Sequence, residues 1–310
     1  MSARAAVALG ALACLWGSSF LFIDLALEGL SPPQVVLGRL TLGALVLGLV
    51  VAALRAALPR RPVIWAHLLA AGLIANVIPW LLLAWGQQQV PSGLAGVLNA
   101  ATPLFTTLMA TLALTDERLH ARRAVGLALG FVGVAVVVGP VELGAAAADR
   151  VPLLPQLAIV GAAACYGVGF IYMRRFLSGR GHPPLVLAAG QLACAAGVLW
   201  LGAPVVATGA PTLTPSVLGA LTGLGVLGTG IAYLLYYRLL GEIGATRTST
   251  VTYLIPVVAV TLGVVVLGEP VRASMLLGAV VVISGVALVQ SQGARRRPVS
   301  GATPAGASDR

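Results

Sequence analysis

Long apolar stretches alternate with short polar turns along almost the whole chain, and their length is the first guide to the fold. A hydrocarbon layer of about 30 Å requires roughly 20 apolar residues in a helix. Turn-forming residues such as Ser31-Pro32-Pro33 and Pro91-Ser92-Gly93 separate the stretches of that length. The predicted membrane-spanning helices cover approximately 5–27, 34–54, 63–86, 93–114, 121–139, 154–175, 185–206, 214–237, 245–267 and 271–290.

One Glu and two Gly residues recur with the same spacing in the two halves of the chain. The first set is Glu117, Gly126 and Gly133, and the second is Glu269, Gly278 and Gly285. Each half carries five predicted spans, and because five is odd, the second half must enter the membrane from the opposite side. Two halves of inverted topology are the sequence signature of a secondary transporter, with its substrate site near the midplane between them.

We therefore expect an all-α integral membrane protein with ten transmembrane helices, arranged as two inverted-topology five-helix repeats. Residues 1–142 are predicted to form the first repeat and residues 151–290 the second, with a disordered cytoplasmic tail over 291–310. Composition agrees with this class: 59% of residues are hydrophobic, 9% are charged, and the mean hydropathy is +0.99. The three cysteines all fall within apolar spans and show no disulfide or metal spacing.

The net charge of +10 comes from 19 basic residues, all of which are arginines. With the N-terminus placed in the cytoplasm, sixteen arginines fall on the cytoplasmic side and only Arg150 and Arg272 outside, while Arg39 lies within a span. This distribution follows the positive-inside rule, so the arginines indicate orientation and not a nucleic-acid surface. We expect a multi-pass protein of the inner or plasma membrane with both termini in the cytoplasm.

Several short motifs resemble one family. They are Trp16-Gly17-Ser18-Ser19-Phe20, Pro103-Leu104-Phe105, and the paired segments Asp116-Glu117-Arg118 and Gly268-Glu269-Pro270. Over roughly residues 5–290 the chain resembles the drug/metabolite transporter superfamily of the ten-span EamA-domain type. The resemblance implies the inverted-repeat fold and export of small metabolites, often amino acids, or of drugs. The second repeat departs from the first motif, with Tyr166 in place of Trp16, so the site is expected to be asymmetric.

Arg39 is the clearest ionisable residue inside a predicted span, and such residues are costly to bury and often functional. One interpretation is a structural ion pair of Arg39 with Asp24, which lies near the outer end of the first span. The other is that Arg39 faces the cavity and holds a substrate carboxylate through a bidentate contact. The sequence leaves both open.

Uncharged polar and aromatic residues on the middle spans are the candidates for the substrate pocket. Asn76 and Trp80 lie four residues apart on one helical face, and Thr229 and Tyr233 repeat that face in the second half. Hydrogen bonding between helices is the alternative role for the hydroxyl and amide groups. The predicted substrate-binding residues are Trp16, Asn76, Trp80, Thr106, Gln191, Thr229, Tyr233 and Tyr253.

Pro103 and Pro256 occupy matching places within the fourth and ninth spans. A proline removes a backbone hydrogen bond, so the pair suits either hinges for alternating access or simple packing kinks.

We expect a secondary transporter, an exporter of small organic metabolites such as amino acids, working by alternating access around a midplane cavity. The alternatives are a sugar-phosphate, nucleotide-sugar or drug carrier of the same superfamily and, with less support, an intramembrane enzyme. The spans contain no convergent carboxylates, metal-ligand cluster or activated nucleophile, so no catalytic residue, metal or cofactor is expected. The expected partners are a small-molecule substrate and the lipid bilayer, without nucleic acid or an obligate protein partner.

Overall fold

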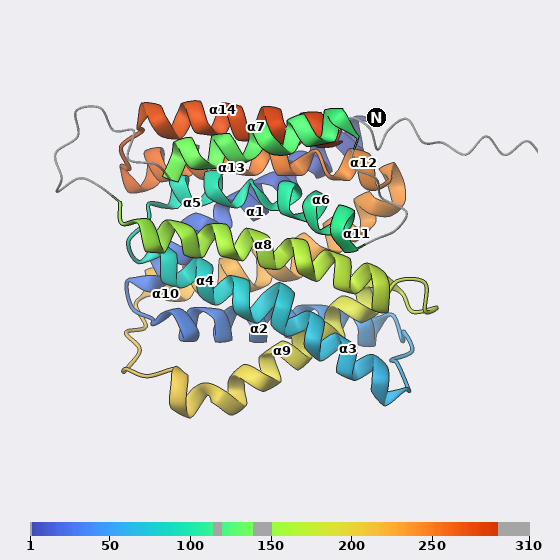
Figure 1. Ribbon diagram of the computed structural model, residues 1–310. Helices are drawn as coiled ribbons and strands as arrows, with labels where there is room; N and C mark the ends of the chain where they lie inside the picture. Colours follow the sequence, from blue (N-terminus) through green and yellow to red (C-terminus); the bar gives the residue numbers. More distant parts are fainter. Residues whose placement is uncertain (1, 114–119, 139–150, 291–310) are drawn as a thin grey trace, which may run out of the picture.

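The computed structural model describes residues 2–113, 120–138 and 151–290, and every regular element within them is a helix (Figure 1). The first half contains α1 (Ala3–Leu27), α2 (Pro32–Ala53), α3 (Pro62–Gly72), η1 (Leu73–Val77), α4 (Ile78–Gln87), α5 (Ser92–Asn99), α6 (Thr102–Ala113) and α7 (Ala121–Val138). The second half contains α8 (Leu153–Phe176), α9 (Pro184–Val206), α10 (Pro215–Thr222), η3 (Gly223–Ile231), α11 (Ala232–Ile243), α12 (Ala245–Thr248), α13 (Val251–Leu267) and α14 (Ala273–Gln290). Glu117 and the predicted tail at 291–310 lie outside the described residues.

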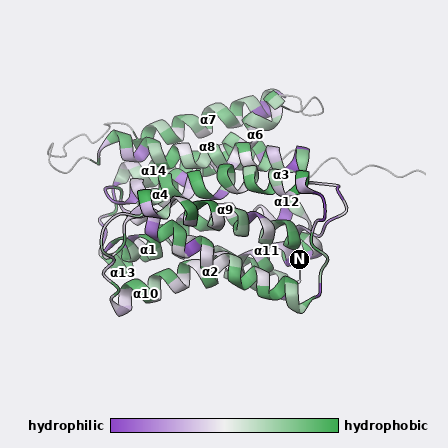
Figure 2. Ribbon diagram, turned by 90° about the horizontal axis from the view of Figure 1, so that it is seen from below, coloured by the Kyte–Doolittle hydropathy of each residue, from purple (hydrophilic) through white to green (hydrophobic). Residues whose placement is uncertain are grey.

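The helices confirm the predicted set of membrane spans. Within the described residues, nine continuous helical stretches are long and apolar enough to cross a membrane, and α13 is a shorter apolar helix of 17 residues. Hydrophobic residues cover the length of the helices, and hydrophilic ones gather mainly toward the two ends of the bundle (Figure 2). The helices begin where the sequence supplies a proline or a cap, as at Ser2, whose hydroxyl accepts the Ala5 N–H at 3.2 Å.

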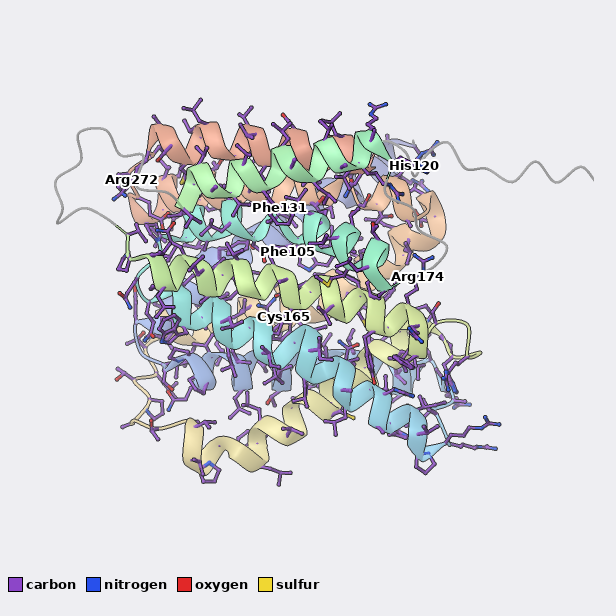
Figure 3. All side chains as sticks on the ribbon, in the orientation of Figure 1. Phe105, His120, Phe131, Cys165, Arg174 and Arg272 are labelled. Atoms are coloured by element: carbon purple, nitrogen blue, oxygen red, sulfur yellow. The ribbon has the colours of Figure 1, made fainter. Side chains whose placement is uncertain are left out.

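The two ends of the bundle are distinguished by the chain termini. α1 begins and α14 ends at one end, here named the terminal end, which lies at the right in Figure 1. His120 and Arg174 lie at the same end, whereas Arg272 lies at the opposite end (Figure 3). α1 therefore runs away from the terminal end while α8, the first helix of the second half, runs toward it, which is the inverted topology predicted from the odd number of spans.

The fifth helices of the two halves, α7 and α14, pack antiparallel against each other (Figure 1). A Cβ atom at Gly126 would lie 2.9 Å from the carbonyl oxygen of Gly285, and one at Gly133 would lie 3.1 Å from that of Gly278. The absence of side chains at these four positions lets the two backbones approach closely. The glycines that recur in the sequence thus form one of the contacts between the repeats.

The third and eighth spans both contain a π-helical segment. η1 separates α3 from α4, and η3 separates α10 from α11. Each π turn accommodates one more residue than an α turn, and such segments are frequent at functional sites. Nothing in the residue pattern of the third and eighth spans indicates these segments.

The two prolines proposed as hinges do not occupy equivalent positions in the structure. The fourth span is divided at Ala100 and Ala101, and Pro103 follows the break as the second residue of α6. Pro256 instead lies inside the continuous helix α13, and the ninth span is divided earlier, between α12 and α13. Because a proline in the first turn of a helix removes no intrahelical bond, only Pro256 has the mid-helix geometry predicted for both.

Candidate functional site

Arg39 of α2 points into the centre of the molecule toward the other repeat. Its Nε donates a hydrogen bond of 3.0 Å to the hydroxyl oxygen of Thr229 in η3. Its guanidinium carbon lies 3.8 Å from the centre of the Trp80 ring, in cation–π contact. The side chain is only 8% exposed, and Thr229 is fully buried. A buried positive charge is therefore held between the two repeats.

A second hydrogen bond between the repeats is equivalent to that of Arg39, but its donor lies in the second repeat and its acceptor in the first. The amide of Gln191 in α9 donates to the side-chain oxygen of Asn76 in η1 at 2.5 Å. Asn76 in turn donates to the hydroxyl oxygen of Tyr233 at 3.3 Å. Arg39 and Gln191 occupy the same place in α2 and α9, counted from Pro32 and Pro184. The second helix of each repeat thus contributes a donor to the third span of the other repeat.

The π-helical segments present the two acceptors of these bonds. Asn76 lies within η1 and Thr229 within η3. The Thr229 hydroxyl donates at 3.1 Å to the carbonyl of Leu224, five residues earlier, while its oxygen accepts from Arg39. The hydroxyl is therefore oriented by the π turn, and both of its hydrogen-bonding roles are used.

A cavity of about 190 Å³ reaches Arg39 at the centre of the bundle. It adjoins a larger cavity of about 540 Å³ that extends to Arg123, Arg174 and Gln290 at the terminal end. Trp16, Thr102, Pro103, Phe170 and Thr252 line both cavities. Among the described residues that line either cavity there is no Asp or Glu. The two cavities together form a path from one end of the bundle to the buried arginine.

Aromatic rings line part of the path. Trp16 and Tyr236 lie 5.4 Å apart between ring centres, and Tyr236 and Tyr237 lie at the same separation. Ser19, Asn99 and Tyr166 add polar groups around the inner cavity. A few polar groups among apolar walls are typical of sites for small organic molecules.

The opposite end of the bundle is closed by a contact between the repeats. The Glu269 carboxylate, just beyond α13, accepts the backbone N–H groups of Ser92 at 2.5 Å and Gly93 at 2.9 Å. These groups belong to the first turn of α5, where a negative charge also interacts favourably with the helix dipole. Glu269 therefore fastens the second repeat to the first on the side away from the path.

The structure gathers most of the predicted site residues around this centre. Trp16, Thr106 and Tyr233 line the larger cavity, and Asn76, Trp80, Gln191 and Thr229 form the buried layer that holds Arg39 and Tyr233. Tyr253 lies apart from them: its hydroxyl donates to Gln290 at 2.7 Å, and its ring packs with a core cluster around Leu104. A role of any of these residues in substrate binding stays a prediction.

The ion pair considered between Arg39 and Asp24 is not formed. Arg39 turns toward Thr229 and Trp80, whereas the charges that act on Asp24 are those of Glu269 and Glu28 near the opposite end. A salt bridge between two described residues, Arg238 and Glu242, lies instead on the surface. The alternative considered for Arg39, that it faces the cavity, agrees with its place in the wall of the inner cavity.

Sequence reasoning did not identify Asn99, Phe170 or Tyr237 as site residues. Asn99 lines the inner cavity, and its side-chain oxygen is buried without a hydrogen-bond partner. The sequence signal for Asn99 is that it is a single amide residue within an apolar stretch. Phe170 and Tyr237 carry no such signal, since aromatic residues in membrane helices are common.

The profile of the EamA-like transporter family matches residues 4–139 and 153–291 of the chain. The chain belongs to the EamA-like transporter family. This transporter is 30% identical over 288 residues to the uncharacterized inner membrane transporter YedA of Escherichia coli K12, covering 91% of this chain and 89% of YedA. It is 27% identical over 285 residues to a probable terminal-alkyne amino-acid exporter of Streptantibioticus cattleyicolor, covering 91% and 92% of the two chains.

The fold of the transporter is also found among solved structures. One crystal structure superposes with a TM-score of 0.65 at 21% sequence identity, covering 95% of this chain and 99% of the other. Family membership and the apolar helices make the transporter a multi-pass membrane protein, and its family is one of transporters and not of enzymes.

Proposed function

We propose that the transporter exports small organic metabolites that carry a carboxylate, such as amino acids, by alternating access around the central cavity. The observation that carries this proposal is Arg39, a buried positive charge that lines the inner cavity without an anionic partner among the described residues. A charged arginine at the centre of a membrane costs about 2.5–3.5 kcal/mol or more. A bound anion offsets that cost.

The geometry of Arg39 leaves its outer nitrogen atoms for a ligand. Only Nε is used by Thr229, and the terminal nitrogens have no hydrogen-bond partner among the described residues. The contact with Trp80 fixes the plane of the guanidinium group. Arg39 lines the inner cavity, and a planar guanidinium with two terminal nitrogens available matches a carboxylate, which accepts two parallel hydrogen bonds.

The surroundings favour a small ligand with an apolar part. The inner cavity of about 190 Å³ suits a single small molecule, and the aromatic walls of the path suit its side chain. One similar protein is named as a probable amino-acid exporter, which agrees with this substrate class. A phosphate ester would call for several cations, whereas Arg39 is the single basic residue that lines the inner cavity among the described residues.

The proposed direction of transport is supported by the orientation expected from the sequence. The excess of arginines at the terminal end favours a cytoplasmic location for that end by the positive-inside rule, and the similarity to YedA suggests the inner membrane. The path then admits substrate from the cytoplasm, while Glu269 closes the outer side. Release outward requires the Glu269 contact to open and the terminal end to close, with the break before Pro103 and the proline at Pro256 as hinges.

The proposal is tested by counterflow in proteoliposomes with three classes of solute. Radiolabelled amino acids are compared with the corresponding decarboxylated amines and with sugar phosphates, using the unchanged protein, Arg39→Gln and Arg39→Lys. We expect saturable exchange of amino acids only. Loss of the charge-assisted bonds in Arg39→Gln lowers exchange by about a hundredfold, and Arg39→Lys lowers it less.

Arg4→Gln serves as the control, since Arg4 is exposed near the N-terminus. Removing the same charge there leaves exchange unchanged. Equal exchange of amines and amino acids, or full activity of Arg39→Gln, would contradict the carboxylate contact. Exchange of sugar phosphates alone would transfer the assignment to the sugar-phosphate carriers of the superfamily.

A further inference from the structure

Two loops at the terminal end, one from each repeat, meet over a basic cavity that is separate from the transport path. The first loop joins α2 to α3 and the second joins α8 to α9. The cavity has a volume of about 560 Å³. Its lining residues are Ala57, Leu58, Arg60, Arg61, Ile64, Arg180 and His182.

The floor of this basic cavity is built by the packing of α3 against α8 and α9. Ile64 and Leu177 are 4% and 3% exposed and belong to one apolar cluster. The indole N–H of Trp65 donates to the carbonyl of Pro59 at 2.9 Å, which ties the first loop to the start of α3. The cavity is therefore supported by buried side chains and does not arise from two unconnected surface loops.

The second loop turns sharply at its arginine. Arg180 stands between Gly179 and Gly181, and both glycines have φ of 75°. Such left-handed backbone is adopted without strain only by glycine. Between these two turns, Arg180 lines the cavity together with Arg60 and Arg61.

The positive charges of the cavity are not neutralised within the described part of the protein. Arg60, Arg61 and Arg180 are exposed, and their guanidinium groups form no ion pair or hydrogen bond with a described residue. No described Asp or Glu lines the cavity. Three like charges around one cavity repel one another, and a bound anion relieves that repulsion.

We propose that this basic cavity binds the phosphate group of an anionic phospholipid. Both loops join membrane-spanning helices, so the cavity lies at the level of the lipid headgroups. Exposed apolar side chains lie on the first loop and at the adjoining helix ends: Leu54, Leu58 and Val63 are 65%, 52% and 51% exposed. They provide a surface for an acyl chain, which a soluble phosphate lacks. Basic pockets between membrane helices on the cytoplasmic side are suited to anionic headgroups.

The bound lipid links the two repeats, because one repeat supplies Arg60 and Arg61 and the other supplies Arg180. The basic cavity shares no lining residue with the path that leads to Arg39. The inference therefore does not rest on the proposed substrate class.

The test is lipid binding by the purified full chain in neutral detergent, followed by native mass spectrometry with phosphatidylglycerol. We expect a first phosphatidylglycerol molecule to bind much more tightly than phosphatidylcholine. The combined change Arg60→Gln, Arg61→Gln and Arg180→Gln weakens that binding by about a hundredfold. Arg180→Gln alone gives an intermediate loss, and all variants keep their unfolding midpoint without lipid because the three side chains are exposed.

The matched control removes three exposed arginines elsewhere at the same end. It combines Arg4→Gln, Arg122→Gln and Arg247→Gln, and none of these residues lines the cavity. Binding within about twofold of the unchanged protein is expected for this control. An equal loss in both triple variants would overturn the proposal, because it would mean that net charge alone attracts the lipid. Displacement of the lipid by an equal concentration of glycerol 3-phosphate would also overturn it, in favour of a soluble anion.

Discussion

At the scale of single residues, two hydrogen bonds between the repeats define the centre of the transporter. They occupy equivalent places, but the donor is charged in one and neutral in the other. Arg39 donates to Thr229, and Gln191 donates to Asn76. The neutral bond is fully satisfied inside the protein, since Asn76 also donates to Tyr233. The charged bond leaves donors facing a cavity. The neutral bond is thus expected to contribute to stability and the charged one to binding.

The first prediction concerns the neutral bond. Asn76→Leu and Gln191→Met each leave a buried amide without its partner, and we expect each change to lower the free energy of unfolding by about 1–2 kcal/mol. The double variant is expected to lower the free energy of unfolding by less than the sum of the two single changes, with a coupling energy of about 0.6–1.7 kcal/mol. Unfolding in mixed detergent micelles measures all three. As a control, Asn76→Leu is combined with Thr261→Val on the exposed face of α13. The effects of these two changes on the free energy of unfolding are expected to add.

Residue types alone could indicate part of this centre and not the rest. Arg39, Asn76 and Gln191 stand out because charged and amide side chains are rare within membrane spans. Thr229 does not, since threonine often bonds its own helix, as Thr106 does with Thr102 here. The side toward which Arg39 turns depends on packing between repeats, which is why Asp24 was an equally reasonable partner from the sequence.

At the scale of elements, close approach of helices decides where the functional side chains lie. Gly43 of α2 makes room for Thr229: a Cβ atom there would lie 2.6 Å from the Thr229 methyl group. Gly48, one and a half turns further along the same helix, has no heavy atom within 4 Å of that position. The two glycines therefore form a matched pair for experiment.

We predict that Gly43→Ala impairs transport and that Gly48→Ala does not. The added methyl group at Gly43 displaces Thr229 and its bond to Arg39, at a cost of about 1–3 kcal/mol, which corresponds to an exchange rate about five- to 150-fold lower. Counterflow of the best substrate measures the effect. Normal exchange by Gly43→Ala would show that Arg39 works without Thr229.

The glycine contact between α7 and α14 leads to a prediction about stability. A Cβ atom at Gly285 would lie 2.5 Å from the backbone nitrogen of Gly130. Because backbone atoms cannot turn aside, Gly285→Ala is expected to lower the free energy of unfolding by about 1–3 kcal/mol. A Cβ atom at Gly197 in α9 would have no heavy atom within 4 Å, so Gly197→Ala is expected to leave the free energy of unfolding unchanged. A comparison of the two unfolding midpoints decides the point.

Among the elements, the spans could be predicted well and the breaks within them could not. The thickness of the bilayer fixes the length of an apolar helix, so the stretches in the sequence mark the helices directly. A π-helical segment such as η1 or η3 keeps the helix apolar and continuous, and it leaves no mark in composition. The break at Ala100 likewise precedes Pro103 and could not be located from the proline alone.

At the scale of the whole molecule, the transporter is open toward the terminal end and closed at the other. The path from Arg39 reaches that end, and Glu269 joins the repeats at the opposite one. A separate cavity of about 370 Å³, lined in part by Glu269 and Ser274, lies on the closed side. Access to each side can be measured independently.

We predict one-sided labelling of single cysteines in a variant without Cys14, Cys165 and Cys194. Ala110→Cys lines the path and is expected to react with a membrane-impermeant thiol reagent only from the cytoplasmic face. Ser274→Cys is expected to react only from the outer face. Inside-out vesicles and intact cells distinguish the two faces, and the reverse pattern would invert the assigned orientation.

Each repeat donates one hydrogen bond to the other, and this reciprocity bears on how such a protein could arise. A five-helix half on its own holds a donor without its acceptor, so only a pair of halves completes the centre. In a pair of identical halves, Arg39 and Gln191 would be the same residue, giving either two buried positive charges or none. Joining the halves in one polypeptide removes that restriction and allows a single charge at the axis of a nearly symmetric molecule. Gene duplication followed by fusion would thus make the proposed recognition of one anionic group accessible to this architecture.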